Sequence, residues 1–189
     1  MTIFHTLLHK VIVLDVSLND LFQQYATPPW AYDVMRFFSD KTHIWYAVIV
    51  FVPALLIANW KKALIFACVL GLAIAGADQA SCLLKHHVAR PRPEHVTYDA
   101  HPESVSPHSF PSSHAANITA ALLVIWVFWP PCRIPTLFVW FVVCYGRLYL
   151  RKHYPLDVAC GALIGCCSAW IALFVWGRIR KKWNVTFGR

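Results

Sequence analysis

Apolar residues along this chain gather into five long runs, separated by short polar or basic segments and by one long polar segment, 85–113, which is predicted to be an active-site loop. The runs cover residues 43–60, 63–84, 114–130, 135–150 and 155–177. A helix that crosses a bilayer needs about 20 predominantly apolar residues. The pattern therefore predicts an all-α fold, an integral-membrane helical bundle with about five transmembrane helices.

Residues 1–42 mix polar with apolar positions and contain no apolar run of that length. Within residues 1–15 the apolar side chains recur at near-helical spacing, which predicts an amphipathic helix at the membrane interface. Pro28 and Pro29 then break the chain, and residues 31–39 are predicted to form a second, short helix. Packing of this segment against the bundle is an equally good interpretation, and the pattern leaves open whether the segment crosses the membrane.

Composition supports a single membrane domain that spans residues 1–189. Hydrophobic residues make up 58% of the chain and charged residues only 14%, whereas soluble domains carry about 25% charged residues. The chain has seven cysteines and no CxxC pair. Six of them lie inside apolar runs and are predicted to be small core residues, not disulfide partners or zinc ligands: Cys68, Cys82, Cys144, Cys160, Cys166 and Cys167.

The net charge of +8 would suggest a nucleic-acid partner in a soluble protein. In a membrane protein, a bilayer surface and an anionic substrate explain it better, so no nucleic acid is expected. With five spans, the segments 60–62, 130–134 and 177–189 share one side and carry Lys and Arg without Asp or Glu. Short basic loops stay in the cytoplasm. The opposite side, with the polar segment 85–113, is therefore predicted to face the periplasm or cell exterior.

Three segments on that opposite side carry the candidate chemistry. They read KHHVARPRP over 85–93, FPSSH over 110–114 and GRLYLRKHYPLD over 146–157. His153 and Asp157 are four residues apart and would share one face of a helix. The carboxylate could then hold one imidazole nitrogen and leave the other free for attack, with Arg147 binding an anion beside it. Taken alone, a His and an Asp at this spacing are more often a surface pair.

Together, in this order, the three segments resemble the signature of the type 2 phosphatidic acid phosphatase family. That signature is Lys, six residues, Arg-Pro; then Pro-Ser-Gly-His; then Ser-Arg, five residues, His, three residues, Asp. The chain departs from it at Ser113, where the family has Gly, and at Gly146, where it has Ser. These departures concern loop geometry and one hydroxyl contact, whereas every charged and imidazole position is present.

The resemblance implies site residues and a mechanism that needs no metal or other cofactor. His153 would attack phosphorus and form a phosphohistidine, Asp157 would hold its imidazole, and His114 would act as general acid and then base. The phosphate-binding residues implied by the family are Lys85, Arg92, Ser112, Ser113 and Arg147. Their cations and the start of a helix at Ser113 suit a phosphoryl group.

The implied function is hydrolysis of a phosphorylated lipid in the bilayer of a bacterial inner membrane, with the site facing the periplasm. Lipid A 1-phosphate and undecaprenyl diphosphate are the favoured substrates. Phosphatidylglycerophosphate, phosphatidate, or transfer of the phosphoryl group to an acceptor other than water are the alternatives. A non-enzymatic protein that binds anionic lipid is a rival from another class, although it would not need His114, His153 and Asp157 together.

Two further features leave alternatives open. The segment 85–113 is rich in histidine and could bind a metal, but its spacing favours ordinary loop histidines: His86, His87, His95, His101 and His108. Asp78 lies within the second apolar run, where a charge is costly in lipid. It either pairs with a base near the site or bonds a neighbouring helix.

Overall fold

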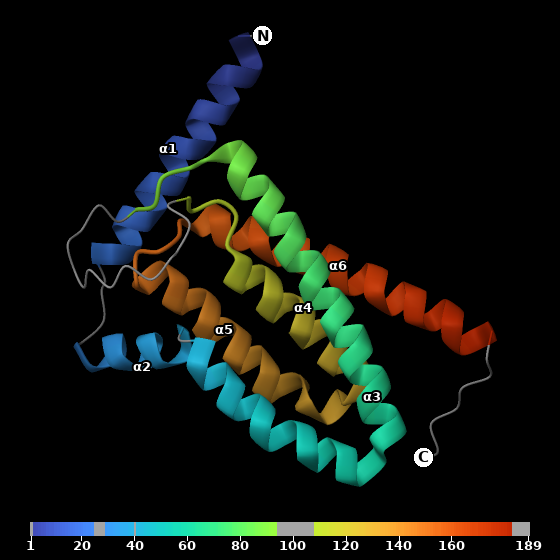
Figure 1. Ribbon diagram of the computed structural model, residues 1–189. Coiled ribbons are helices and arrows are strands. Elements are labelled where there is room, and N and C mark those ends of the chain that lie inside the picture. The colour runs from blue at the N-terminus through green and yellow to red at the C-terminus, as the bar shows by residue number, and fades with distance from the viewer. Residues whose placement is uncertain (1, 25–28, 40, 94–107, 183–189) are drawn as a thin grey trace.

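The computed structural model describes residues 2–24, 29–39, 41–93 and 108–182, and within these ranges it consists of helices joined by turns (Figure 1). The elements are α1 (Thr2–Gln24), α2 (Pro29–Ser39), α3 (Lys41–Val88), α4 (Ser113–Phe128), the short 3-10 helix η1 (Pro130–Cys132), α5 (Arg133–Tyr149) and α6 (Pro155–Lys182). The predicted all-α bundle is confirmed.

The first two predicted spans are the two halves of α3, which bends at Asn59. Asn59 has extended backbone angles, φ −163° and ψ 88°. Its side-chain oxygen accepts a hydrogen bond from the Lys62 amide at 3.0 Å, so it caps the second half as an N-cap residue does. By length and hydropathy, Asn59–Val88 and Pro155–Lys182 can each cross a membrane. Helices α4 and α5 are shorter, with 16 and 17 residues.

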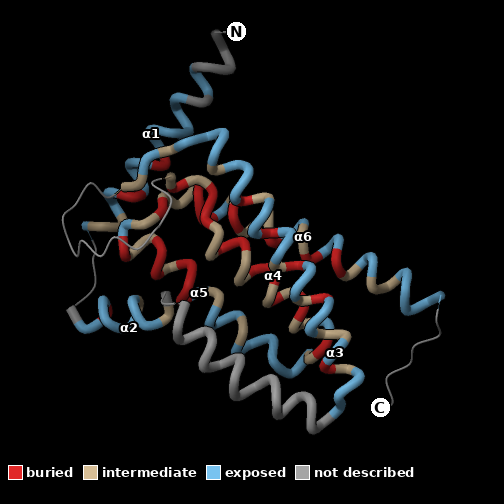
Figure 2. The backbone as a smooth tube through the Cα atoms, viewed as in Figure 1, coloured by how far each residue is buried: buried red, intermediate tan, exposed pale blue. Residues whose placement is uncertain are grey.

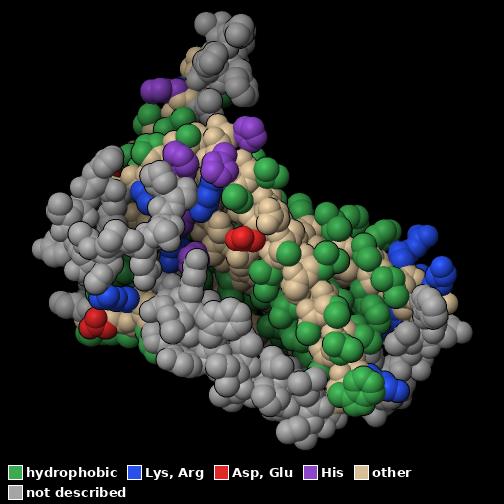
Figure 3. Space-filling model, in the orientation of Figure 1, with side chains coloured by type: hydrophobic (Ala, Val, Ile, Leu, Met, Phe, Trp, Pro, Cys, Tyr) green, Lys and Arg blue, Asp and Glu red, His purple; other side chains and the backbone are tan. Residues whose placement is uncertain are grey.

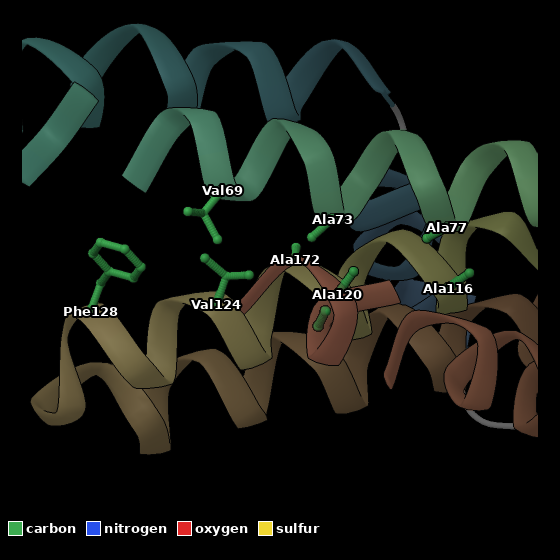
Figure 4. Close-up of a cluster of buried hydrophobic side chains, with 9 residues drawn as sticks. Val69, Ala73, Ala77, Ala116, Ala120, Val124, Phe128 and Ala172 are labelled. Carbon is green, nitrogen blue, oxygen red and sulfur yellow. The ribbon is translucent and has the colours of Figure 1, made fainter. Parts of the chain in front are cut away.

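The centre of the bundle is built from small side chains of α3, α4 and α6 (Figure 4). Its buried members are Val69, Ala73, Ala77, Ala116, Ala120, Val124, Phe128, Ala169 and Ala172. Alanine lets helix backbones approach closely, which is how helices associate within membranes, where lipid is as apolar as leucine. The core therefore holds together through close packing of backbones.

Large apolar side chains cover the outside of the same helices instead. Leu72 on α3, Phe138 on α5 and Trp170 on α6 are all more than half exposed. Figure 2 shows the buried residues confined to the inward-facing sides, and Figure 3 shows hydrophobic side chains along the outside of the bundle. An apolar exterior over a small-residue interior is the arrangement of a protein that faces lipid.

The prediction that six cysteines are core residues is largely wrong. All seven cysteines are free, but Cys68, Cys82, Cys166 and Cys167 are exposed on the outside of the helices. Only Cys144 is buried. In a membrane bundle the lipid-facing side of a helix is as apolar as its core side, so an apolar run does not reveal which side a cysteine occupies.

Helix α1 lies across the end of the bundle where α5 leads into α6 (Figure 1). It continues to Gln24, beyond the predicted 1–15, because polar residues at four-residue spacing attach its second half to the bundle. Asp15 and Asn19 are buried, whereas apolar residues such as Leu14 and Leu18 are exposed. Helix α2 starts at Pro29, two residues before the predicted start, since proline fits the first turn of a helix. An interfacial position for α1 stays a prediction.

The basic segments predicted to share one side do meet at the opposite end of the bundle. The Lys62 ammonium lies 4.9 Å from the centre of the Trp129 ring. Lys62, Trp176 and Arg180 also line a small cavity of about 110 Å³ at this end. The charges at this end are therefore separated from the three motif segments by the length of the helices.

Candidate active site

The three motif segments converge at one end of the bundle although they are far apart in sequence. The Ser109 hydroxyl donates to the carbonyl of Pro91 at 2.9 Å, and the Ser109 amide donates to the carbonyl of Arg90 at 2.7 Å. Ser109 directly precedes the second segment, so these bonds join the first segment to the start of the second. The Ser112 amide donates to the backbone oxygen of Asp157 at 3.0 Å, which joins the second segment to the third.

The first segment starts on a helix and not in a loop. The predicted loop 85–113 is wrong at its beginning, because α3 continues to Val88 and carries Lys85, His86 and His87 in its last turn. The Ala89 amide donates a hydrogen bond to the Lys85 carbonyl at 3.1 Å and so ends the helix. Ala89 has left-handed backbone angles, with φ 47°, as is common for the residue after a helix. Lys85 is therefore fixed by helical backbone.

Ser112 is the N-cap of α4 and does not reach an open surface. Its side chain is fully buried, and its hydroxyl oxygen accepts from the Ala115 amide at 3.4 Å. The oxygen that caps the helix can still donate its own hydrogen, so phosphate binding by Ser112 stays a prediction. Ser113 and His114 follow on the first turn and are partly exposed. The first amides of a helix have no acceptor within that helix, so this turn suits an anion.

His153 is held by a backbone carbonyl. Its Nδ1 atom lies 2.7 Å from the Ser109 oxygen and its side chain is almost completely buried. A carbonyl oxygen can only accept, so Nδ1 carries the hydrogen and Nε2 keeps its lone pair. Asp157 Oδ2 lies 3.8 Å from the same nitrogen, beyond hydrogen-bond distance. The Nδ1 hydrogen was expected to bond Asp157, but it bonds the Ser109 carbonyl instead. The Asp157 carboxylate lies farther from the same nitrogen.

Its surroundings keep His153 neutral. Burial removes water from the imidazolium and lowers the pKa of His153 to about 4, and the nearby charges of Arg147 and Arg92 act in the same direction. Asp157 opposes them without overcoming them. At neutral pH the ring is therefore an uncharged base with an available lone pair.

Asp157 is fully buried and is positioned by two donors. Its Oδ1 atom accepts from Arg90 Nη1 at 2.8 Å, and its Oδ2 atom accepts from the Tyr154 amide at 2.9 Å. The same Arg90 nitrogen lies 2.7 Å from Asp15 Oδ2 on α1. No role was predicted for Arg90 or Asp15 from the sequence. Arg90 lies inside the first motif segment, and this position is a signal that could have identified it. No sequence spacing relates Asp15 to Asp157.

Three cations gather beside the imidazole. Arg92 and Arg147 are close enough to Lys85 to repel its ammonium, and Arg92 Nη1 donates to the Lys152 carbonyl at 3.0 Å. Arg147 is only 3% exposed, and its Nε atom has no hydrogen-bond partner among the described residues. Burying a guanidinium beside other cations is costly unless an anion joins them. The arrangement is thus built to receive an anion next to His153.

The polar features outside this group have simpler roles. Asp78 Oδ1 accepts from the Asn117 side chain at 3.3 Å, which favours the bond between neighbouring helices, although Asp78 also attracts Lys85. His86 and His87 are exposed, while His95 and His101 lie outside the described residues. In the part of the chain that the structure describes, no three His, Cys, Asp or Glu side chains are placed to hold a metal ion.

Known proteins resemble this chain in sequence and in fold. The sequence model of the PAP2 superfamily matches residues 63–181. A lipid A 4'-phosphatase of Bacteroides thetaiotaomicron is 32% identical over 174 residues, which cover 86% of this chain and 76% of that protein.

Two crystal structures share the fold. LpxE of Aquifex aeolicus superposes with a TM-score of 0.63 at 24% identity, over 85% of this chain and 94% of that one. A PAP2-type phosphatidylglycerolphosphate phosphatase of Bacillus subtilis superposes with a TM-score of 0.70 at 18% identity, over 90% and 88%.

Proposed function

The chain belongs to the PAP2 superfamily and is a membrane phosphatase, and we propose that it hydrolyses a phosphate monoester of lipid A through a phosphohistidine. One observation carries the mechanism more than any other. A buried guanidinium, that of Arg147, lies with Lys85 and Arg92 beside a neutral imidazole whose Nε2 keeps its lone pair. A phosphoryl group is proposed to bind among these cations, where the imidazole can attack it.

In the first step Nε2 of His153 attacks phosphorus, the bond from phosphorus to the lipid oxygen breaks, and a bond from phosphorus to nitrogen forms. His114 donates a proton to the departing lipid oxygen. The imidazole becomes cationic as it is phosphorylated, and the buried carboxylate of Asp157 stabilises that charge across 3.8 Å. The Ser109 carbonyl keeps the Nδ1 hydrogen in place throughout.

In the second step a water molecule gives its proton to His114 and its oxygen attacks phosphorus. The bond from phosphorus to Nε2 of His153 breaks, the imidazole becomes neutral again, and inorganic phosphate leaves. Lys85, Arg92 and Arg147 stabilise the negative oxygens in both transition states. Ser113 and the first-turn amides of α4 are proposed to bind the same oxygens. Every group in this scheme belongs to the protein, so the reaction requires no metal ion.

The lipid A assignment rests on the curated relative, which is named for that substrate and shares 32% of its residues with this chain over most of its length. This resemblance favours lipid A over undecaprenyl diphosphate among the two substrates expected from the sequence. Either phosphate of lipid A presents the same dianion to the site.

An apolar cavity between α1 and α5 suits the chains of a lipid. It has a volume of about 310 Å³ and is lined by Leu18, Leu21 and Phe22 of α1 and by Tyr145 of α5. Tyr145 also stacks with Phe141 and Tyr149, at 5.9 and 6.2 Å between ring centres. This row follows α5 toward the turn that carries His153. We propose that a hydrocarbon chain of the substrate lies along it.

The distribution of charge supports a periplasmic site in a bacterial inner membrane. Lys62 and Arg180 lie at the end opposite the site, and such basic ends stay in the cytoplasm. Residues 1–189 are proposed to work as one domain, because α1 and α2 both contact the bundle.

Phosphate release by the detergent-purified protein tests the proposed function. The substrates are lipid A, undecaprenyl diphosphate, phosphatidylglycerophosphate and phosphatidate, each with and without EDTA. We expect release from lipid A that EDTA does not change, and a rate below about one-hundredth of it for His153→Ala. If His153→Ala still releases phosphate at the wild-type rate, the proposed mechanism is wrong. If the wild type releases phosphate only from a lipid other than lipid A, the proposed substrate is wrong.

A further inference from the structure

We propose that Asp15 of α1 acts through Arg90 as a positioning residue for Asp157 and His153, so that the N-terminal helix is part of the active site. The inference rests on the proposed function. It adds to that function a residue that lies outside the three motif segments and outside residues 63–181, which match the family.

The contacts form a continuous chain from α1 to the imidazole. A single nitrogen, Arg90 Nη1, lies 2.7 Å from Asp15 Oδ2 and 2.8 Å from Asp157 Oδ1. Asp15 is 5% exposed and Asp157 is not exposed at all. The Arg90 guanidinium also lies 3.8 Å above the centre of the Tyr154 ring. Arg90 is therefore contacted from three sides: by an ion pair with Asp15, a hydrogen bond to Asp157 and the face of the Tyr154 ring.

The other oxygen of Asp15 fixes the start of α6. Asp15 Oδ1 accepts from the Leu156 amide at 2.8 Å, one residue before Asp157. Leu156 lies in the first turn of α6, where an amide has no acceptor in its own helix. Asp15 thus holds both the cation that binds Asp157 and the backbone that carries it.

Further along α1, Gln23 contacts the turn that precedes His153. Its side-chain nitrogen donates to the Leu148 carbonyl at 2.9 Å, and its oxygen accepts from Arg151 Nε at 3.1 Å. Asp15 and Gln23 are eight residues apart and lie on one face of the helix. This face spans the α5–α6 turn on both sides of His153.

The charges explain why Asp15 matters for the reaction. Asp157 alone would be neutralised by Arg90, and no negative charge would remain to stabilise the phosphorylated imidazolium. With Asp15 included, two carboxylates share one guanidinium, so the group keeps one net negative charge next to His153. In a buried site such a charge acts over several ångströms. Asp15 therefore restores the charge that Arg90 removes.

The test compares kcat and KM for phosphate release in Asp15→Asn, Arg90→Gln, Arg90→Lys and the double variant Asp15→Asn/Arg90→Gln. Asp20→Asn is the matched control, since Asp20 is exposed on the same helix and its loss changes the net charge equally. His153→Ala gives the rate without the nucleophile. Elution of each variant as a single detergent-solubilised species, with wild-type helicity, shows that the variant has folded.

We expect Asp15→Asn and Arg90→Gln to lower kcat about 10- to 100-fold with little change in KM, because neither residue touches the substrate. The double variant should lose little more than either single variant, since the residues act as a unit. Arg90→Lys should recover much of the loss, because one ammonium can contact both carboxylates.

Two results would overturn the inference. Wild-type kcat in Asp15→Asn, with His153→Ala inactive, would remove Asp15 from the site and leave the proposed function intact. A rise in KM alone would make α1 a substrate-binding element instead of a positioning one. Failure of the proposed function would look different, because His153→Ala would then match the wild type, and the inference would fall with it.

Discussion

The imidazole of His153 donates its Nδ1 hydrogen to the carbonyl of Ser109, 44 residues earlier in the chain, at 2.7 Å. The same Ser109 bonds the carbonyls of Arg90 and Pro91 through its amide and hydroxyl. One residue directly before the second segment therefore orients the proposed nucleophile of the third and fixes the backbone of the first. The three segments form one unit because of these backbone contacts.

The first prediction concerns the titration of His153. Because its pKa is lowered to about 4, the ring should stay neutral, with hydrogen on Nδ1, as pH falls from 7 toward 4. Nitrogen NMR of protein labelled at histidine measures both the tautomer and the midpoint, with His153→Ala identifying the signal. A midpoint near the ordinary 6.5, or hydrogen on Nε2, would contradict the environment described above.

The same lowered pKa has a consequence for stability. Between about pH 6.5 and 4 the unfolded chain takes up a proton at His153 that the folded protein does not bind. Acidification through this window therefore favours unfolding. In His153→Gln this contribution should disappear, so Tm should fall less steeply with decreasing pH than it does in the wild type.

Much of the fold could be predicted from the sequence, because lipid demands long apolar helices and the runs show where they lie. The break near residue 60 and the start of α4 at Ser113 follow from local signals, an Asn-Trp-Lys-Lys turn and a Pro-Ser-Ser start. Which side of each helix faces the core could not be predicted, as the exposed Cys68 and Cys167 show. Their lipid-facing and core-facing surfaces are equally apolar.

The site was only partly predictable for a related reason. Spacing predicted that His153 and Asp157 lie on one face of a helix, but His153 lies in the turn before α6. The two side chains are nevertheless neighbours, 3.8 Å apart, because that turn leads directly into the helix. Spacing says nothing about backbone atoms, so it could not predict that the Ser109 carbonyl holds the imidazole of His153. The pairing of Asp15 with Arg90 depends on how α1 crosses the bundle. That packing is a tertiary property that no local pattern encodes.

A second prediction tests the cation group. Arg147→Met removes a buried charge that is repelled by Lys85 and Arg92, so its Tm without phosphate should equal or exceed that of the wild type. Phosphate at about ten times its Kd should stabilise only the wild type, by about 1.4 kcal/mol. For a chain of this size that is roughly 3–5 °C. Equal stabilisation of both proteins would place the anion elsewhere.

A third prediction concerns the contact between α4 and α6. A Cβ atom added to Gly161 would collide with the Ser112 carbonyl oxygen and approach Ala115. Gly161→Ala should therefore lower the free energy of unfolding by about 1–3 kcal/mol and reduce phosphate release, because α4 carries the second segment. Gly71→Ala is the control, since nothing lies within 4 Å of its added Cβ atom. Thermal unfolding of both variants measures the difference. Equal Tm values for Gly161→Ala and Gly71→Ala would refute the close contact.

A fourth prediction tests the apolar cavity. Leu21→Trp fills it and should raise KM for lipid A by about 10-fold or more while leaving KM for p-nitrophenyl phosphate, which has no hydrocarbon chain, unchanged. Leu7→Trp makes the same substitution at an exposed position of α1 that does not line the cavity. If both variants behave alike toward both substrates, the hydrocarbon chain lies somewhere else.

The central claim is that His153 carries the phosphoryl group, and rapid quenching of the enzyme with lipid A tests it directly. The quenched protein is digested at alkaline pH, where phosphohistidine survives, and its peptides are examined by mass spectrometry. We predict one phosphorylated peptide containing His153, whose label is lost in acid and is absent from His153→Ala. Phosphate on another residue, or none while lipid A is still hydrolysed, would contradict the account.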